Sequence, residues 1–106
     1  MISPTIGRRV WYWPSINDRS SPASINGMKI NSDEQPCDAG VSYVWNDRLI
    51  NVSVSDHNGI MHQRTSVPLL QDDDVREPGR ACCQWMPYQA AQAKKNETES
   101  EKGDSK

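Results

Sequence analysis

The amino-acid sequence predicts a small, mainly β protein. Apolar and polar residues alternate in short runs over much of its 106 residues, which is typical of strands that bury one face. The segment Asp56-His57-Asn58-Gly59 favours a hairpin, because Asn-Gly suits the positive φ angles of a tight turn. A chain of this length forms one domain, since two separate cores would not fit in it.

Five segments are expected to form strands. The first, 8–13, is rich in Trp, Tyr and Val and ends at Pro14, after which a long loop over 14–38 holds many Pro, Ser, Asn, Asp and Gly residues. The other strands are expected at 39–45, 48–55, 60–67 and 81–86, with an acidic loop over 71–80 before the last. This order matches a five-stranded antiparallel SH3-like barrel or meander. The alternative is a cone-like or two-layer α+β arrangement with a C-terminal helix.

The C-terminal end is expected to leave the domain. Pro87 favours the start of a short helix. Residues 91–106 hold four basic and four acidic residues and no large apolar residue, so they cannot offset their own ordering entropy. The sequence therefore predicts one β-rich domain over 1–90 and a disordered tail over 91–106.

The expected hairpin decides which side chains share a face. A loop of two residues and a loop of four both pair odd with even positions, so they give the same faces. The face expected to be buried holds Ile50, Val52, Val54, Met61, Thr65 and Val67, and pairing around Asn46-Asp47 adds Val41, Tyr43 and Trp45. The polar face holds Asn51, Ser53, His62, Arg64 and Ser66.

Catalytic and metal-binding motifs are missing from the sequence, so we expect no enzyme, no cofactor and no metal. There is no Gly-rich phosphate loop, no Gly-x-Ser-x-Gly and no His-Glu-x-x-His. Three Cys and two His could in number bind zinc, but Cys82 and Cys83 are adjacent and would point to opposite sides of a strand. One thiol is expected to be buried and the other exposed. Asp72-Asp73-Asp74 is expected to be a solvated acidic loop.

Charge and hydropathy limit the partners. A net charge of −2 excludes an extended surface for long nucleic acid. No apolar run is long enough to cross a membrane, and the start lacks the basic and apolar blocks of a signal peptide. We therefore expect a cytosolic protein with free thiols.

Arginine and aromatic residues point to a ligand site. Seven of the eight basic residues in the first 90 are Arg, which grips phosphate with two hydrogen bonds and stacks on flat rings. The alternative is that His62 and Arg64 only face solvent and that two of the four Trp fill the core. The candidate ligand-binding residues are Arg8, Arg9, Arg64 and Arg80 for phosphate, Trp11, Trp85 and Tyr88 for stacking, and Asn51 and His62 for ribose or base.

Several short blocks also carry a family resemblance. They are Arg8-Arg9-Val10-Trp11-Tyr12-Trp13, Pro36-Cys37-Asp38-Ala39-Gly40-Val41, Val52-Ser53-Val54-Ser55-Asp56-x-Asn58-Gly59, Thr65-Ser66-Val67 and Cys83-Gln84-Trp85-Met86-Pro87-Tyr88. In order and spacing these blocks resemble small tailed-phage proteins, and among them the Thoeris anti-defence sponge proteins.

The resemblance implies a phage protein that binds and sequesters a cyclic nucleotide immune signal without cleaving it. Members of that family hold cyclic ADP-ribose isomers made by bacterial TIR-domain enzymes, and some hold cyclic oligonucleotides. The resemblance further implies a homo-oligomer, a dimer or larger, in the host bacterial cytoplasm. The short polar tail after Tyr88 departs from the family, whose members can carry more helix there.

The alternative function is an SH3-like phage interaction module that binds a host or virion protein through its aromatic surface. Two further alternatives are weaker. The acidic net charge argues against a nucleic-acid binder, and a signal-degrading enzyme would need His57 or His62 as an essential residue.

Overall fold

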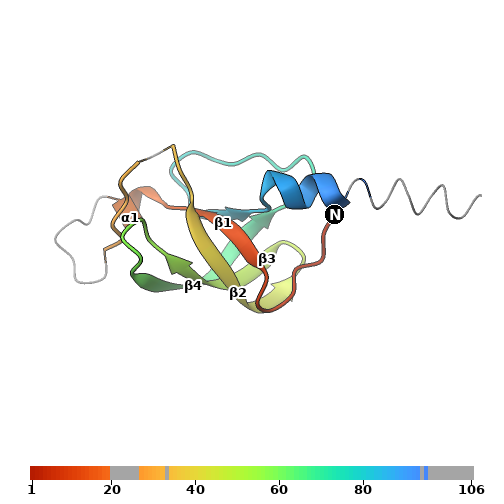
Figure 1. Ribbon diagram of the computed structural model, residues 1–106, viewed down its shortest axis with the longest axis horizontal. Helices are drawn as coiled ribbons and strands as arrows, with labels where there is room; N and C mark the ends of the chain where they lie inside the picture. Colours follow the sequence, from red (N-terminus) through yellow and green to blue (C-terminus); the bar gives the residue numbers. More distant parts are fainter. Residues whose placement is uncertain (20–26, 33, 94, 96–106) are drawn as a thin grey trace, which may run out of the picture.

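Five strands close into a barrel (Figure 1). The computed structural model describes residues 1–19, 27–32, 34–93 and 95. Within these ranges the strands are β1 (Arg9–Trp13), β2 (Cys37–Asn46), β3 (Leu49–Ser55), β4 (Met61–Leu70) and β5 (Cys82–Gln84), with a short helix α1 (Ile16–Arg19) after β1. They pair in the order β1-β2-β3-β4-β5, and β5 returns to β1. The mainly β, five-stranded barrel is thus confirmed, and it is consistent with an SH3-like barrel.

One strand pair and one strand end differ from the prediction. The short β4–β5 pair is parallel, whereas the other four pairs are antiparallel. Strand β4 also continues through Pro68, where its end was expected. Leu69 N donates to Arg48 O (3.0 Å), so the preceding residue directs its backbone nitrogen away from β3. Pro68 has no N–H, but a backbone N–H at this position would not bond to β3. The ladder between β3 and β4 therefore loses no hydrogen bond there.

The C-terminal helix covers residues 87–93, as Pro87 predicted. Proline fits the first turn, and Gln89 Oε1 accepts a hydrogen bond from Met86 N (2.9 Å), which satisfies a free donor at the helix start. The helix lies beside the N-terminal segment (Figure 1). Residues of both segments line one cavity. It passes residue 91, where the tail was expected to begin. Residues 94 and 96–106 of that expected tail lie outside the described residues.

The core fills the barrel with side chains from every strand. Val41, Ile50, Val52, Val54 and Val67 are buried, as the predicted apolar face requires. All three thiols are also buried, so the expectation of one exposed cysteine is wrong. Strand β5 is paired on both edges, and the loop before it is joined to α1 by the hydrogen bond from Ile16 N to Gly79 O (3.1 Å), so little of β5 faces solvent. The buried hydrophobic residues are Val10, Tyr12, Met28, Cys37, Ala39, Val41, Ile50, Val52, Val54, Val67, Leu69, Cys82, Cys83 and Trp85.

Register shifts between β2 and β3 turn two predicted core residues outward. Val41 pairs with Val52, but the register slips before Tyr43, which lies opposite Asn51. A second slip follows Val44. Because each slip of one residue exchanges the faces, Val44 packs against the core in place of its neighbours. Tyr43 and Trp45 are 48% and 56% exposed, which corrects their assignment to the core.

The β3–β4 connection reverses the predicted faces of β4. Ser55 pairs with Met61 and Val54 with His62, so five residues join the strands, not two or four. An odd loop pairs even with even positions. His62 and Arg64 therefore turn toward the barrel, while Met61 and Thr65 are exposed, contrary to the prediction.

A bulge then restores Val67 to the core. Val52 pairs with Arg64 but Ile50 pairs with Val67, so β4 holds one extra residue between these pairs. Ser66 has a φ of 53°, in the left-handed region that bulges use. Its N–H donates to Asn51 Oδ1 (2.8 Å), which satisfies the donor that the bulge takes out of the ladder.

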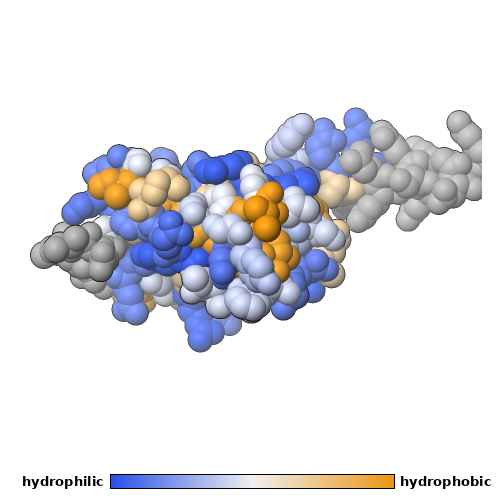
Figure 2. Space-filling model, turned by 90° about the horizontal axis from the view of Figure 1, so that it is seen from below, coloured by the Kyte–Doolittle hydropathy of each residue, from blue (hydrophilic) through white to orange (hydrophobic). Residues whose placement is uncertain are grey.

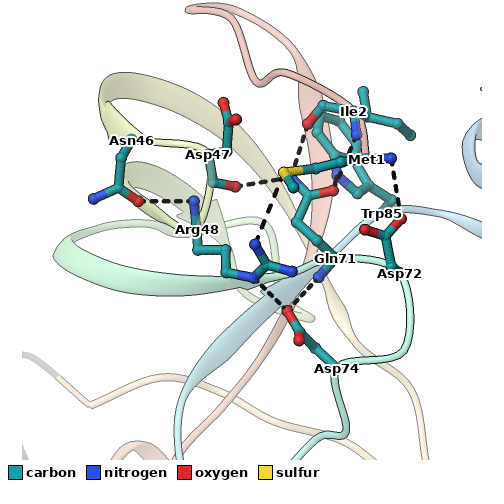
Figure 3. A network of polar contacts seen from close by, with 9 residues as sticks. All are labelled: Met1, Ile2, Asn46, Asp47, Arg48, Gln71, Asp72, Asp74 and Trp85. Atoms are coloured by element: carbon teal, nitrogen blue, oxygen red, sulfur yellow. Dashed lines mark hydrogen bonds and ion pairs between the residues drawn. The ribbon is translucent and has the colours of Figure 1, made fainter.

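A buried glutamine seals one end of the barrel (Figure 3). Gln71 is only 2% exposed, and its side chain makes four hydrogen bonds. Oε1 accepts from Ile2 N (3.1 Å) and Trp85 Nε1 (3.2 Å), and Nε2 donates to Ile2 O (2.7 Å) and Asp47 O (2.8 Å). One amide thus joins the N-terminal segment, the β2–β3 turn and the residue after β5.

Arg48, Asp72 and Asp74 form hydrogen bonds and ion pairs next to Gln71. Asp74 Oδ2 accepts from Gln71 N and from Arg48 Nε, both at 2.9 Å (Figure 3). Asp72 pairs with the Met1 amino group at 3.0 Å. The expected solvated acidic loop is therefore in part a set of structural ion pairs.

At the opposite end of the barrel, the buried carboxylate of Asp56 binds the chain between β1 and β2. Asp56, 4% exposed, accepts hydrogen bonds from His62 Nε2 (2.8 Å) and from the backbone N–H of Lys29, Asn58 and Ile60. Burial raises the pKa of Asp56, but these hydrogen bonds outweigh it and lower the pKa to about 2. The carboxylate thus orders both the β3–β4 turn and the chain before β2.

Replacing Gln71 by leucine is expected to destabilise the barrel by roughly 2–4 kcal/mol. The change leaves the buried Trp85 indole N–H without its acceptor and removes the hydrogen bonds of the amide to Ile2 and Asp47. Urea unfolding of Gln71→Leu measures the loss. Gln63→Leu, an exposed glutamine on β4, is the control and should change the free energy of unfolding by less than about 0.5 kcal/mol. Equal effects of the two changes would contradict this role.

Stability is expected to fall with acid through Asp56. Its folded pKa of about 2 lies below the ordinary aspartate pKa of 3.8, so its contribution is complete above about pH 4 and is lost as the pH falls toward 2. The melting temperature of the protein should therefore drop across this window. Asp56→Asn should melt lower at neutral pH and show a shallower acid decrease. An unchanged acid slope in this variant would show that other carboxylates control the transition.

Candidate ligand-binding face

Two predicted ligand residues meet at the sealed end of the barrel. The Arg8 guanidinium lies over the Trp85 ring, with Cζ 5.4 Å from the ring centroid. Trp85 is only 5% exposed and its indole donates to Gln71, so this ring belongs to the core and cannot stack on a ligand. Arg8 itself is exposed.

The side chains of His62 and Arg64 bind carboxylates of the protein itself. Arg64 Nη2 donates to Asp18 Oδ1 (2.9 Å), and Asp18 Oδ2 accepts from Tyr12 Oη (2.6 Å). Burial raises the pKa of Asp18, but hydrogen bonds from Tyr12, Ser15 and Arg64 lower it overall. Burial and the Asp18 carboxylate raise the pKa of Tyr12. The polar face predicted around His62 and Arg64 is therefore wrong, because the odd loop turns both toward the barrel.

Arg80 and Tyr88 stand on elements that carry no other predicted ligand residue. Arg80 precedes β5 and forms an exposed ion pair with Glu77 (3.1 Å). Tyr88 stands on the C-terminal helix and is exposed. In the part of the chain that the structure describes, no hydrogen bond, ion pair or ring contact joins either residue to another predicted ligand residue.

Trp11 belongs to a ridge on the outside of β1. Its ring meets the Trp13 ring edge-on, with centroids 6.4 Å apart. Arg76 Cζ lies 4.1 Å from the Trp13 ring centroid, and Trp13 Nε1 donates to Gln84 (2.8 Å). Among the described residues Arg76 has no carboxylate partner. The cation thus occupies one face of Trp13, and the half-buried Trp11 presents the freer ring.

The outer face of β2 and β3 brings rings, amide, hydroxyls and a guanidinium together. We use "outer face" for Arg9 of β1, Ser42, Tyr43 and Trp45 of β2, and Asn51 and Ser53 of β3. Of these, only Arg9 and Asn51 were predicted as ligand residues. Sequence patterning assigned the two rings to the core, and the register shifts that expose them leave no clear mark in the apolar pattern.

The exposed rings form a fixed pair. Tyr43 and Trp45 have centroids 4.9 Å apart and planes inclined by 73°. Trp45 Nε1 donates to Asn51 Oδ1 (3.0 Å), so the indole is held in place on the sheet. In an edge-to-face pair each ring keeps at least one face clear of its partner, and the clear faces of the two rings point in different directions.

Arg9 reaches across β2 beside the hydroxyls. Its Nε and Nη2 bind both carboxylate oxygens of Asp38, in an exposed ion pair. Its Nη1 lies over Gly40, 2.7 Å from where a β-carbon would stand. Gly40 pairs with Ser53 on β3, and Ser53 Oγ lies 3.3 Å from Ser42 Oγ. Because Gly40 has no side chain, the Arg9 guanidinium can lie over it, next to Ser42 and Ser53.

A groove lies away from the outer face, between α1 and the loop before β5. Its volume is ≈ 550 Å³, and Pro68, Leu70 and Val75 form its apolar lining. Val75 is 83% exposed. Neighbouring Ile16 of α1 is also exposed, so apolar side chains stand on both sides of the groove.

The face seen in Figure 2 has small, separate apolar patches, and the described residues form no metal cluster. Seen from below, most of the protein is hydrophilic or neutral, with apolar residues in isolated spots (Figure 2). No group of three or more His, Cys, Asp or Glu in the described ranges could hold a metal ion. No helix in the same ranges is long and apolar enough to cross a bilayer.

Comparison with protein-family models, curated proteins and solved structures finds no match. The resemblance to the sponge proteins therefore rests on the short blocks of the sequence and stays a prediction.

Arg64→Ala is expected to act on stability and not on ligand binding. The change leaves the part-buried Asp18 without its cation, which costs roughly 1–3 kcal/mol. Urea unfolding measures this loss, and Arg64→Lys should recover part of it. Retention of any bound nucleotide, measured beside it, should equal that of the unchanged protein. Weakened retention at full stability would return Arg64 to the ligand site.

Proposed function

We propose that the protein captures a cyclic nucleotide signal of the cyclic ADP-ribose class on its outer face and holds it without cleavage. The observation that carries the proposal is the exposed Tyr43–Trp45 pair on one sheet surface with Arg9 Nη1 and Asn51 Nδ2, two donors that have no acceptor among the described residues.

The rings supply the sequence-independent part of binding. A nucleobase stacked on an aromatic side chain gains about 1–3 kcal/mol. Trp45 is suited to this role because Asn51 already holds its indole, so little side-chain entropy is lost on binding. Tyr43 meets it at a steep angle and can contact the edge of the stacked base or its ribose.

Arg9 supplies the charge. Its ion pair with Asp38 is exposed on both sides, and such pairs contribute only about 0–1 kcal/mol. A phosphate can therefore replace Asp38 at the guanidinium at small cost, and it gains a two-point contact. The Ser42 and Ser53 hydroxyls lie in the same area and suit ribose hydroxyls.

Capture of this kind needs rings and donors but no nucleophile, which is why we propose a sponge and not an enzyme. From the resemblance to phage sponge proteins we propose that the protein acts in the host cytoplasm and sequesters a signal made by TIR-domain enzymes. A homo-oligomer belongs to the same proposal, because a second copy would cover a ligand that an open sheet leaves exposed.

The test is recovery of a captured signal. Purified protein is mixed with cyclic ADP-ribose isomers and cyclic di- and trinucleotides, freed of unbound ligand, and then heated. We expect an intact nucleotide in stoichiometric amount. Trp45→Ala should weaken its binding about 5- to 100-fold, and Gly40→Ala, whose new methyl displaces only the flexible end of Arg9, should weaken it without a change in charge.

Arg80→Gln is the matched control, because it removes an exposed arginine away from the outer face and should bind as the unchanged protein does. If all inputs return unbound in the wash, the sponge proposal fails.

A protein-interaction module is the second candidate, favoured by the groove between α1 and the loop before β5. Exposed Val75 and Ile16 beside a groove of ≈ 550 Å³ suit an extended apolar peptide. Val75→Asp should abolish peptide binding and leave nucleotide retention unchanged.

A further inference from the structure

The groove between α1 and the loop before β5 has an arginine without a carboxylate partner at its edge. We infer that this groove docks an extended segment of a partner protein, that the segment carries apolar side chains and an acidic residue, and that Arg76 binds its carboxylate. The inference goes beyond nucleotide capture. It rests on the second candidate function, which uses the same groove.

The groove can cover apolar side chains of an extended chain. Its volume is ≈ 550 Å³, and Pro68, Leu70 and Val75 are among its lining residues. Val75 is 83% exposed, and Ile16 of α1 is 60% exposed. Ile16 Cδ1 lies 2.8 Å from where a β-carbon of Gly79, another lining residue, would stand. Apolar side chains of a bound segment would remove these surfaces from water, which favours association.

The charge left uncompensated at this groove is positive. Among the described residues, Glu77 and Arg80 are the charged groups that line it, and they pair with each other at 3.1 Å. Of the aspartates at 72–74, the first two line the cavity beside the N-terminal segment, and the third binds Arg48. Arg76 is thus the cation of this loop that has no carboxylate partner in the described part of the chain.

Arg76 is held at the edge of the groove by Trp13. Its Cζ lies 4.1 Å from the Trp13 ring centroid. Trp13 pairs across the strands with Cys82, so the two side chains stand on the same side of the sheet, and Cys82 lines the groove. Burial raises the pKa of the Cys82 thiol, and the nearby charge of Arg76 lowers it in part. The guanidinium therefore lies within electrostatic reach of the groove.

The stacked guanidinium is prepared to bind a carboxylate. Stacking uses its flat face and leaves the N–H donors in its plane free. Among the described residues no oxygen accepts a hydrogen bond from Arg76. A planar fork of two N–H groups matches the two oxygens of a carboxylate. Phosphorylated peptides are usually bound by clusters of arginines, whereas here the other arginine of the groove is neutralised by Glu77, which favours an acidic side chain.

The test uses two matched peptide arrays. The first holds capped ten-residue peptides on a Gly-Ser background, each with two central leucines and one Glu at one of the other positions. The second carries Lys in place of Glu. Fluorescence anisotropy of the tightest Glu peptide and its Lys counterpart should give about 5- to 30-fold tighter binding of the Glu peptide, because Arg76 attracts one charge and repels the other. Salt at about 1 M should reduce this preference.

Four variants locate the preference. Arg76→Gln should remove it, and Arg76→Glu should reverse it toward the Lys peptide. Arg8→Glu is the matched control, because Arg8 is also exposed and lies over a ring, that of Trp85, but does not line the groove. It should keep the preference. Val75→Ser removes apolar surface without a change in charge, and it should weaken the binding of both peptides.

The outcomes separate the charge preference from docking itself. Equal binding of the Glu and Lys peptides, or tighter binding of the Lys peptide, would overturn the role of Arg76 and leave the groove as a docking site. A preference for Glu that survives in Arg76→Glu would also overturn that role. Binding of no peptide from either array would overturn the docking site and the charge preference together. Nucleotide capture on the outer face depends on none of these results.

Discussion

The side-chain oxygen of Asn51 ties together two places where the strands of this barrel leave regular register. On one side it accepts the indole N–H of Trp45, which faces outward because β2 slips against β3. On the other side it accepts the N–H of Ser66, whose left-handed backbone makes the bulge in β4. A bulge persists when the backbone groups it releases find partners. Asn51 is that partner, and it also holds an aromatic ring at the surface. The bulge in β4, which returns Val67 to the core, and the slip in β2, which exposes Trp45 on the outer face, are therefore stabilised by the same side chain.

Polar residues close the two ends of the barrel, where a chain with only 35% hydrophobic residues has little apolar volume left. Gln71 seals one end with a fully used amide. Asp56 and Asp18 fasten the chain at the other. Gln71 and Asp56 are buried and Asp18 is part-buried, and each is hydrogen-bonded, so burial adds specificity with little penalty. At both ends, carboxylates bind Arg or His side chains that would otherwise be free to bind a ligand. Arg48 and Arg64 are held by carboxylates, and His62 by Asp56.

Sequence patterning predicted the barrel and the order of its strands, because alternation and turn residues are local signals. It also predicted the buried valines of β3, whose alternation is regular. The faces of β2 and β4 could not be predicted, because they depend on loop parity and on bulges. A five-residue connection stabilised by Asp56 looks, in sequence, like a shorter Asn-Gly turn. One extra residue moved His62 and Arg64 inward, and one slip moved Tyr43 and Trp45 outward. Of the nine predicted ligand residues, Arg9 and Asn51 share a surface, and their neighbours there differ from those expected.

Cross-strand nuclear Overhauser effects between backbone protons measure this register directly. The account predicts contacts of Val54 with His62 and of Val52 with Arg64, and a contact of Ile50 with Val67 in the same spectrum. Between β2 and β3 it predicts Val44 opposite Ile50. Direct pairing of Val52 with Thr65 or Gln63 would return His62 and Arg64 to the outer side of β4. Direct pairing of Tyr43 with Ile50 would mean an unbroken register between β2 and β3. Tyr43 and Trp45 would then lie in the core, and the outer face proposed as the ligand site would not exist.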